Sequence, residues 1–123
     1  MPFKTQQHFI DQLEKAGELI RIKEFVNPHL EIAEVVDRIS KGCPDPKGGN
    51  TKYPFMVGGY ALLFENTGTP FPLLINAMGS EKRMCMALGV NELDDVAKDI
   101  DTLFHSLTSP KKSLTDKLKM LPE

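Results

Sequence analysis

Residues 58–89 read GGYALLFENTGTPFPLLINAMGSEKRMCMALG, and this stretch decides the fold. Residues 60–64 and 73–75 are continuous apolar runs of strand length, bounded by glycine and proline. Ser80 can cap a helix by accepting a backbone N–H bond, and Gly89 stands where a helix ends in a left-handed residue. The stretch therefore predicts two buried strands followed by a helix.

The chain before this stretch predicts a helix, a strand and a second helix. Thr5 is the predicted N-cap of the first helix, and Gly17 ends it. Residues 18–26 alternate apolar and charged side chains, which is typical of a half-buried strand. Residues 30–40 carry apolar side chains at helical spacing and predict the second helix.

The chain after this stretch predicts one long amphipathic helix over residues 92–107, with Asn91 as its N-cap. Its apolar residues recur at spacings of three and four, so we expect the resulting stripe to meet a sheet or another helix. Residues 111–123 predict a further short helix. Because so short a helix is marginally stable alone, we expect it to pack on parts of a longer protein that this sequence lacks.

Composition excludes several classes of protein. The 123 residues are 41% hydrophobic and 26% charged, which is typical of a single globular domain spanning residues 1–123. No apolar run approaches the roughly 18 residues of a transmembrane segment. The formal net charge is −2 with scattered Lys and Arg, so there is no basic field for nucleic acid. The N-terminus lacks the apolar core of a signal peptide, which predicts a cytoplasmic protein.

These elements predict an α+β fold. We expect a small mixed sheet of about three to four strands, built from residues 18–26, 60–66 and 73–78 and flanked by helices. Residues 43–59 are dense in proline and glycine, without a clear period. They predict a loop insertion, which costs little free energy.

No catalytic constellation is visible in the sequence. The three histidines lack the spacing of a metal site, and no serine stands in a nucleophile-elbow motif. Glu65 and Asn66 end a predicted buried strand and are worth inspecting, although a role in the turn is favoured. The sequence therefore assigns no catalytic, cofactor-binding or metal-binding residue.

One weak candidate for a binding site is the start of the helix that follows Gly79. Gly79, Ser80, Lys82 and Arg83 place free N–H groups and two cations at a helix N-terminus, which favours an anion. The alternative is an ordinary cap with solvated charges. This alternative is favoured because no second glycine completes a dinucleotide-binding or Walker motif.

Three blocks of the sequence resemble a known family. They are FIDQLEKAGELIRI at 9–22, VNPHLEIAEVVDR at 26–38 and ALLFENTGTPFPLLINAMGSEKRMCMALG at 61–89. Together they resemble the N-terminal domain of the UbiD family of carboxy-lyases, the 3-octaprenyl-4-hydroxybenzoate decarboxylase group. In the family pattern the insertion at 43–59 is absent, so this segment departs from it.

The resemblance implies a parent enzyme several times longer than this chain. Such enzymes reversibly decarboxylate aromatic or unsaturated carboxylic acids, as in ubiquinone and menaquinone synthesis. They use prenylated flavin mononucleotide (prenylated FMN) and a divalent metal, Mn or Mg, and many are homo-oligomers. Their catalytic, flavin and metal residues lie in a later domain, so the resemblance gives no residue of this chain a catalytic role.

Two functions are consistent with the sequence. The first is a non-catalytic N-terminal domain of a UbiD-like decarboxylase, inactive alone and packed on the flavin-binding domain of the same polypeptide. The alternative is a stand-alone binding or protein-interaction module whose contact surface is the anion site at the helix start after Gly79 or the loop at residues 53–56.

Overall fold

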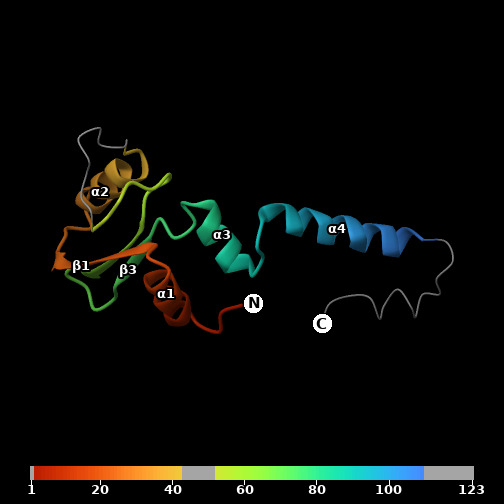
Figure 1. Cartoon of the computed structure of the whole chain (residues 1–123). Helices are drawn as coiled ribbons and strands as arrows, with labels where there is room; N and C mark the ends of the chain where they lie inside the picture. The colour runs from red at the N-terminus through yellow and green to blue at the C-terminus, as the bar shows by residue number, and fades with distance from the viewer. Residues whose placement is uncertain (1, 43–51, 110–123) are drawn as a thin grey trace. The chain divides into compact units, whose positions relative to one another are not determined.

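The computed structural model describes residues 2–42 and 52–109 (Figure 1). Two compact units make up the chain, Met1–Gly89 and Val90–Glu123. In the part of the chain that is described, no helix is both long and apolar enough to cross a membrane.

The first unit is built on a three-stranded mixed sheet. Its strands are β1 (Leu19–Phe25), β2 (Ala61–Asn66) and β3 (Leu73–Ile75), in the spatial order β1-β2-β3. β1 pairs with β2 in parallel, and β2 pairs with β3 in antiparallel. The predicted α+β fold with a small mixed sheet is therefore confirmed.

Two helices cover opposite faces of this sheet (Figure 1). α1 (Gln6–Lys15) packs its buried Ile10 and Leu13 on one face. α2 (Glu31–Ser40) packs Ile32 and its neighbours on the other face. The side chains of residues 61–64 in β2 alternate between two apolar clusters, because successive strand residues point to opposite faces. The first cluster contains Ile10, Leu13, Leu19, Ala61 and Leu63, and the second contains Ile32, Tyr60, Leu62 and Phe64.

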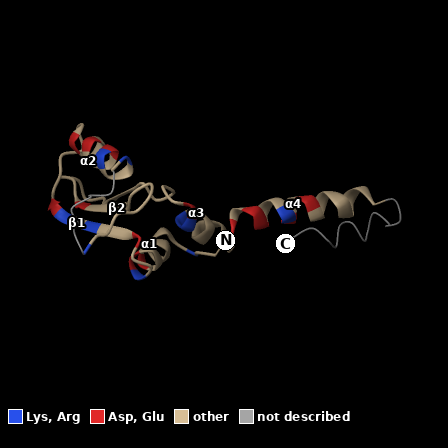
Figure 2. Ribbon diagram, turned by 45° about the horizontal axis from the view of Figure 1, so that its top comes forward, with Lys and Arg blue, Asp and Glu red and all other residues tan. Residues whose placement is uncertain are grey.

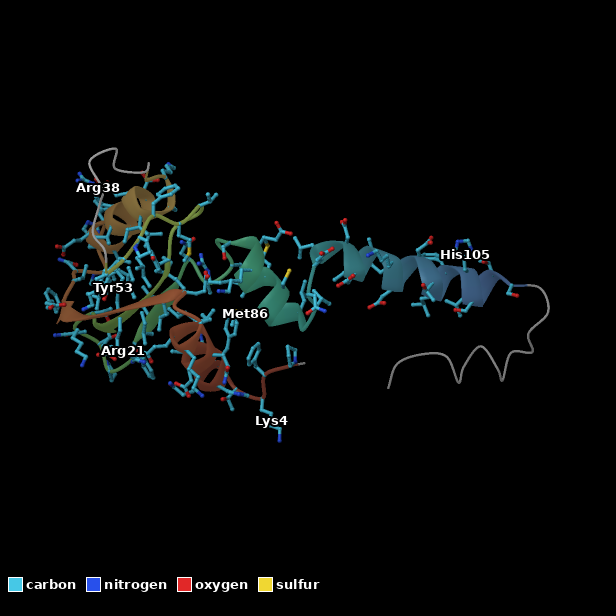
Figure 3. The ribbon with its side chains drawn as sticks, in the orientation of Figure 1. Lys4, Arg21, Arg38, Tyr53, Met86 and His105 are labelled. Atoms are coloured by element: carbon cyan, nitrogen blue, oxygen red, sulfur yellow. The ribbon has the colours of Figure 1, made fainter. Side chains whose placement is uncertain are left out.

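α3 (Glu81–Leu88) follows the sheet in the first unit. Its predicted cap is confirmed, because the Ser80 hydroxyl accepts a hydrogen bond from the Arg83 backbone N–H at 3.2 Å. Gly89 ends the helix with φ 71°, as a left-handed C-terminal residue should. Met86 of α3 packs against the first cluster, near α1 (Figure 3).

The second unit contains α4 (Leu93–Thr108), so the predicted long helix is confirmed. Its N-cap is Glu92 and not Asn91 as predicted. The backbone N–H of Glu92 donates to the Asp95 carboxylate three residues later, at 3.2 Å, which starts the helix one residue further along. Within the described residues no α4 side chain is buried, so the covering that we expected for its apolar stripe is not observed there.

The predicted strands differ from the observed strands at their ends. β3 stops at Ile75 and does not continue to residue 78, because Asn76 turns the chain with φ 57°. The side-chain amide of Asn76 donates to the carbonyl oxygens of Gly58 and Tyr60, each at 2.9 Å, which fixes the turn. The other two strands are each one residue shorter than predicted at one end or both.

Two predicted segments fall wholly or partly outside the described residues. Of the insertion at 43–59, residues 52–59 are described and contain neither helix nor strand, with Met56 packed against the second cluster. The short helix predicted at 111–123 lies outside the described residues.

Candidate functional site

The polar centre of the first unit is an ion pair between Arg83 and Glu18. The Arg83 side chain is 0% exposed and that of Glu18 is 6% exposed, and Arg83 Nη1 lies 2.9 Å from Glu18 Oε2. Glu18 directly precedes β1, and Arg83 lies in the first turn of α3. Burying either charge alone would be costly, so each residue makes burial of the other possible.

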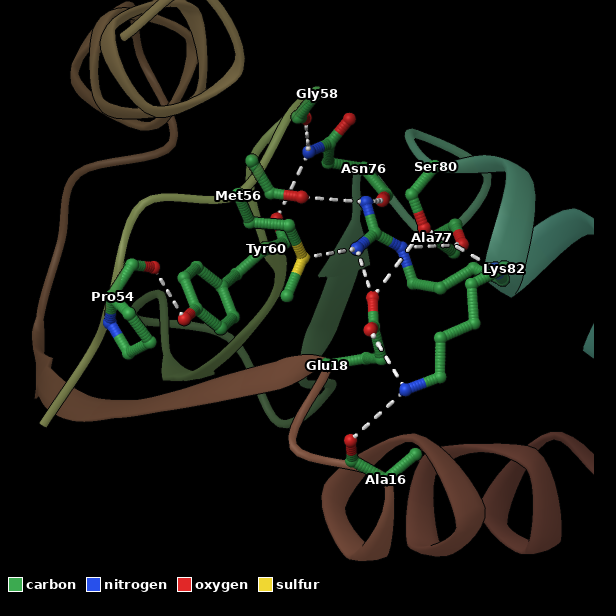
Figure 4. A network of polar contacts seen from close by, with 12 residues as sticks. Ala16, Glu18, Pro54, Met56, Gly58, Tyr60, Asn76, Ala77, Ser80 and Lys82 are labelled. Carbon is green, nitrogen blue, oxygen red and sulfur yellow. Dashed lines mark hydrogen bonds and ion pairs between the residues drawn. The ribbon is translucent and has the colours of Figure 1, made fainter. Parts of the chain in front are cut away.

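The Arg83 guanidinium finds an acceptor for each of its five N–H groups (Figure 4). Nη1 donates to Glu18, as described above. The remaining acceptors are Met56 Sδ at 3.5 Å from Nη1, Gly59 O at 2.8 Å and Asn76 O at 3.2 Å from Nη2, and Ala77 O at 3.2 Å from Nε. Arg83 therefore joins α3 to the segments that precede β2 and follow β3, and no donor is left for an external anion.

Glu18 receives two more contacts from the start of α3, one from its N-cap Ser80 and one from Lys82 in its first turn (Figure 4). Lys82 Nζ lies 3.2 Å from Glu18 Oε1, and the Ser80 hydroxyl lies 3.4 Å from Oε2. Lys82 also donates to the Ala16 carbonyl at 3.4 Å. The positive end of the α3 dipole thus faces a carboxylate supplied by this chain itself.

The backbone around this ion pair is packed closely enough to require glycine. A Cβ atom on Gly58 would lie 1.9 Å from the carbonyl oxygen of Gly79, and Gly58 has φ 79°. A Cβ atom on Gly79 would lie 2.2 Å from the Asn76 side-chain oxygen. Both glycines therefore permit the close approach of the β2 and α3 entry segments.

Tyr60 closes the opposite side of the same region. Its hydroxyl donates to the Pro54 carbonyl at 2.7 Å, and its ring meets Tyr53 edge-on with centroids 6.0 Å apart. Burial raises the pKa of the Tyr60 hydroxyl above its ordinary value of 10.0, and the nearby charge of Glu18 adds to the effect. The hydroxyl therefore acts as a neutral donor.

The four residues of the predicted anion site do lie together. Gly79, Ser80 and Lys82 line a hollow of about 350 Å³, which Glu18 and Glu81 also line. The expected alternative, a cap with solvated charges, fits Lys82, which is 59% exposed, but it is wrong for the fully buried Arg83. Anion binding stays a prediction, and both of its cations already have a carboxylate partner.

The other polar pair singled out in the sequence divides between two roles. Glu65 accepts a hydrogen bond from Arg21 at 2.5 Å, and Arg21 also binds Glu14 at 3.0 Å (Figure 3). Asn66 Oδ1 accepts from the Gly68 backbone N–H at 3.4 Å, in the turn after β2. The favoured turn role therefore describes Asn66, whereas Glu65 belongs to an ion-pair network on the surface.

Sequence reasoning missed the pairing of Glu18 with Arg83. A signal was present, because Met86 and Ala87 follow Arg83 by three and four residues and place it on an apolar face of α3. Among the described residues no group of His, Cys, Asp or Glu is arranged to hold a metal ion. The polar centre can position backbone segments, and its donors and acceptors are used within the chain.

The fold and this centre define a small α+β domain whose buried charges serve its own architecture. The sequence places that domain in a family. Residues 10–101 match the family model of the 3-octaprenyl-4-hydroxybenzoate carboxy-lyase N-terminal domain, so the chain belongs to this family.

The chain is also similar to longer proteins. It is 41% identical over 124 residues to an uncharacterized protein of Aquifex aeolicus, covering 98% of this chain and 22% of that protein. It is 37% identical over 120 residues to an uncharacterized protein of Archaeoglobus fulgidus, covering 97% of this chain and 21% of that protein. The chain thus spans about a fifth of the length of these relatives.

Proposed function

We propose that this chain is the N-terminal, non-catalytic domain of a longer, cytoplasmic UbiD-like decarboxylase, and that it packs on the flavin-binding domain of the same polypeptide. The single observation that carries the proposal is the family match over residues 10–101. The closed polar centre supports it, because the Arg83 donors are used within the domain and leave none for a substrate carboxylate.

The parent reaction would be reversible, non-oxidative decarboxylation of an aromatic or unsaturated carboxylic acid, as in quinone biosynthesis, by a homo-oligomer. Prenylated FMN, with Mn or Mg, would supply the electron sink for this reaction. The described residues do not fit either group, since they offer no metal-ligand cluster and the guanidinium donors are filled. No step of the reaction is therefore assigned to this chain.

An activity comparison tests the proposal. The 123-residue chain and the longer protein are each supplied with prenylated FMN and Mn²⁺, and CO₂ release is measured with a panel of aromatic and unsaturated acids. We expect release from the longer protein alone and no flavin absorbance retained by the short chain. Flavin binding or decarboxylation by the short chain would show that the assignment of a silent domain is wrong.

The Arg83→Met variant of the longer protein sharpens this test. If Arg83 serves architecture only, the variant loses folded protein while its activity per mole of folded enzyme stays the same. A lower activity per folded mole, with unchanged flavin occupancy, would instead place Arg83 in the catalytic machinery.

A second candidate function is favoured by one observation, the hollow of about 350 Å³ that Gly79, Ser80 and the 59% exposed Lys82 side chain line. It is a binding module for an anion such as phosphate. Phosphate titration followed by the amide shifts of residues 79–83 tests it, with Lys82→Gln as the comparison variant. Unmoved amide signals in the native chain would remove this candidate.

A further inference from the structure

α4 carries an apolar stripe that is exposed in the described structure. Ile100 is 51% exposed, Phe104 is 63% exposed and Leu107 is 36% exposed. The stripe repeats at alternating spacings of three and four residues, which is the pattern of a helix that packs along its length. Its members are Leu93, Val96, Ala97, Ile100, Leu103, Phe104 and Leu107.

Carboxylates border this stripe on both sides. With 3.6 residues per turn, Asp94 and Asp101 fall along one edge of the stripe, and Glu92 and Asp99 fall along the other. Figure 2 shows these acidic bands along α4 with a single basic band.

The basic band is Lys98, which lies on the face opposite the stripe. Lys98 Nζ lies 3.3 Å from the Asp95 carboxylate, so this charge is paired behind the stripe. His105 is also off the stripe, with Nε2 3.5 Å from Asp101. The edges of the stripe therefore carry acidic groups without a compensating Lys or Arg of α4.

This charge pattern decides between possible occupants of the stripe. A second copy of α4 would bring carboxylates against carboxylates, which is unfavourable along a helix pair. An anionic lipid surface would be repelled for the same reason. The complementary surface is an apolar groove with Lys or Arg on both edges.

We propose that α4 docks by this stripe into an apolar, basic-edged groove on the part of the longer protein that follows this domain. This inference rests on the proposed function for the existence of that longer protein. Its support is positional as well as electrostatic. The family match ends at residue 101, inside α4, and the relatives are about five times as long as the chain.

Hydrogen exchange measured by mass spectrometry tests the docking. The amides of α4 are compared between the 123-residue chain and the longer protein at equal concentration. We expect exchange at least about tenfold slower in the longer protein, because docking stabilises the helix against local opening. The double variant Ile100→Ser, Phe104→Ser should abolish this difference.

A matched pair of charge variants tests the basic edges of the groove. Asp101→Lys reverses a charge at the edge of the stripe, whereas Thr102→Lys introduces a cation on the opposite face. Protection of α4 in the longer protein should fall in the first variant and stay within about twofold in the second. Raised salt should weaken protection in the native protein, since edge charges are screened.

Several results would overturn the docking proposal. They are a gene that stops after Glu123, equal α4 protection in both proteins, protection that rises with protein concentration, and protection unchanged by Asp101→Lys. The gene end would refute the proposed function as well. If the longer protein released no CO₂ from any acid yet protected α4 in a charge-dependent way, only the decarboxylase assignment would fail.

Discussion

The two units of the chain differ in what they bury, because the first has two buried apolar clusters and a buried ion pair, whereas no described α4 side chain of the second is buried. The first unit buries a charged side chain, Arg83, and gives it five acceptors of its own. The second unit leaves the Phe104 ring 63% exposed between rows of carboxylates. A region with its own buried core and satisfied polar groups can be stable alone, whereas an amphipathic helix without a buried side chain needs another surface to cover its apolar stripe.

Truncating one phenylalanine in each unit should give the largest difference. Phe64 is 0% exposed in the second cluster, so Phe64→Ala should cost about 4 kcal/mol of unfolding free energy through lost burial and a cavity. Phe104→Ala should change the unfolding free energy by less than about 0.5 kcal/mol. Both tyrosines lie in the first unit, so urea unfolding followed by tyrosine fluorescence measures its stability. Equal losses of unfolding free energy in Phe64→Ala and Phe104→Ala would contradict this difference between the two units.

Removing the buried cation should have the next largest effect. Arg83→Met leaves Glu18 buried without its main partner and should cost about 3 kcal/mol, at the low end for a broken buried pair because Lys82 stays nearby. Lys82→Met, at a 59% exposed position, is the control and should cost less than about 1 kcal/mol. The same urea titration checks both. A loss of unfolding free energy below about 1 kcal/mol in Arg83→Met would mean that water replaces the guanidinium as the partner of Glu18.

The glycine contact beside this pair should come third. Gly58→Ala should cost about 2 to 3 kcal/mol, because its new methyl group would meet the Gly79 carbonyl and its φ is unfavourable for alanine. Gly17→Ala shares the positive φ, at 73°, but its methyl group would meet no atom within 4 Å. Gly17→Ala should therefore cost only about 1 kcal/mol of unfolding free energy. Thermal unfolding of both variants separates steric cost from backbone cost, and equal costs would show that the entry segments can move apart.

The smallest effect is electrostatic and concerns the surface of the first unit. Hydrogen bonding to Arg21 lowers the pKa of the Glu14 carboxyl below its ordinary value of 4.5. Because the folded-state pKa is the lower one, this pair stabilises the fold above pH 4.5, and the contribution is lost as pH falls through the folded-state pKa. Its size should be below about 1 kcal/mol, since Glu14 is 49% exposed and screened.

Carbon-detected NMR titration of the Glu14 carboxyl checks this effect. The midpoint should lie below 4.5 in the native chain and return toward 4.5 in Arg21→Met. Lys23→Met, on the same strand, should leave it nearly unmoved. A native midpoint at or above 4.5 would contradict the ion pair.

The features predicted best from the sequence are those that depend on residues close together in the chain. Ser80 and Gly89 bracket α3 as expected, because caps depend on residues within one turn. β2 and β3 were found from short apolar runs and β1 from alternating apolar and charged residues. The end of β3 was not found, since Asn76 takes its positive φ through bonds to Gly58 and Tyr60. Such contacts carry no local signal.

The polar centre was harder to predict for the same reason. Glu18 and Arg83 are 65 positions apart in the chain, and they meet only after the sheet has formed. Local reasoning placed Arg83 at a helix start and expected it to be solvated, which is the usual place for arginine. Its burial becomes necessary only when Glu18 is placed opposite. The surface that the α4 stripe meets was likewise not predicted, because an amphipathic stripe predicts a partner without identifying it.

The parallel pairing of β1 with β2 also has a consequence for how the chain acquires its structure. β3 follows β2 after residues 67–72 alone, so this hairpin closes a short loop and forms early. β1 can pair with β2 only when α2 and the whole crossover have been brought back across the sheet, and we expect this slower search to limit the folding rate. During synthesis the apolar faces of α1 and β1 therefore stay uncovered until residue 66 has emerged, and that interval is when chaperones have most to protect.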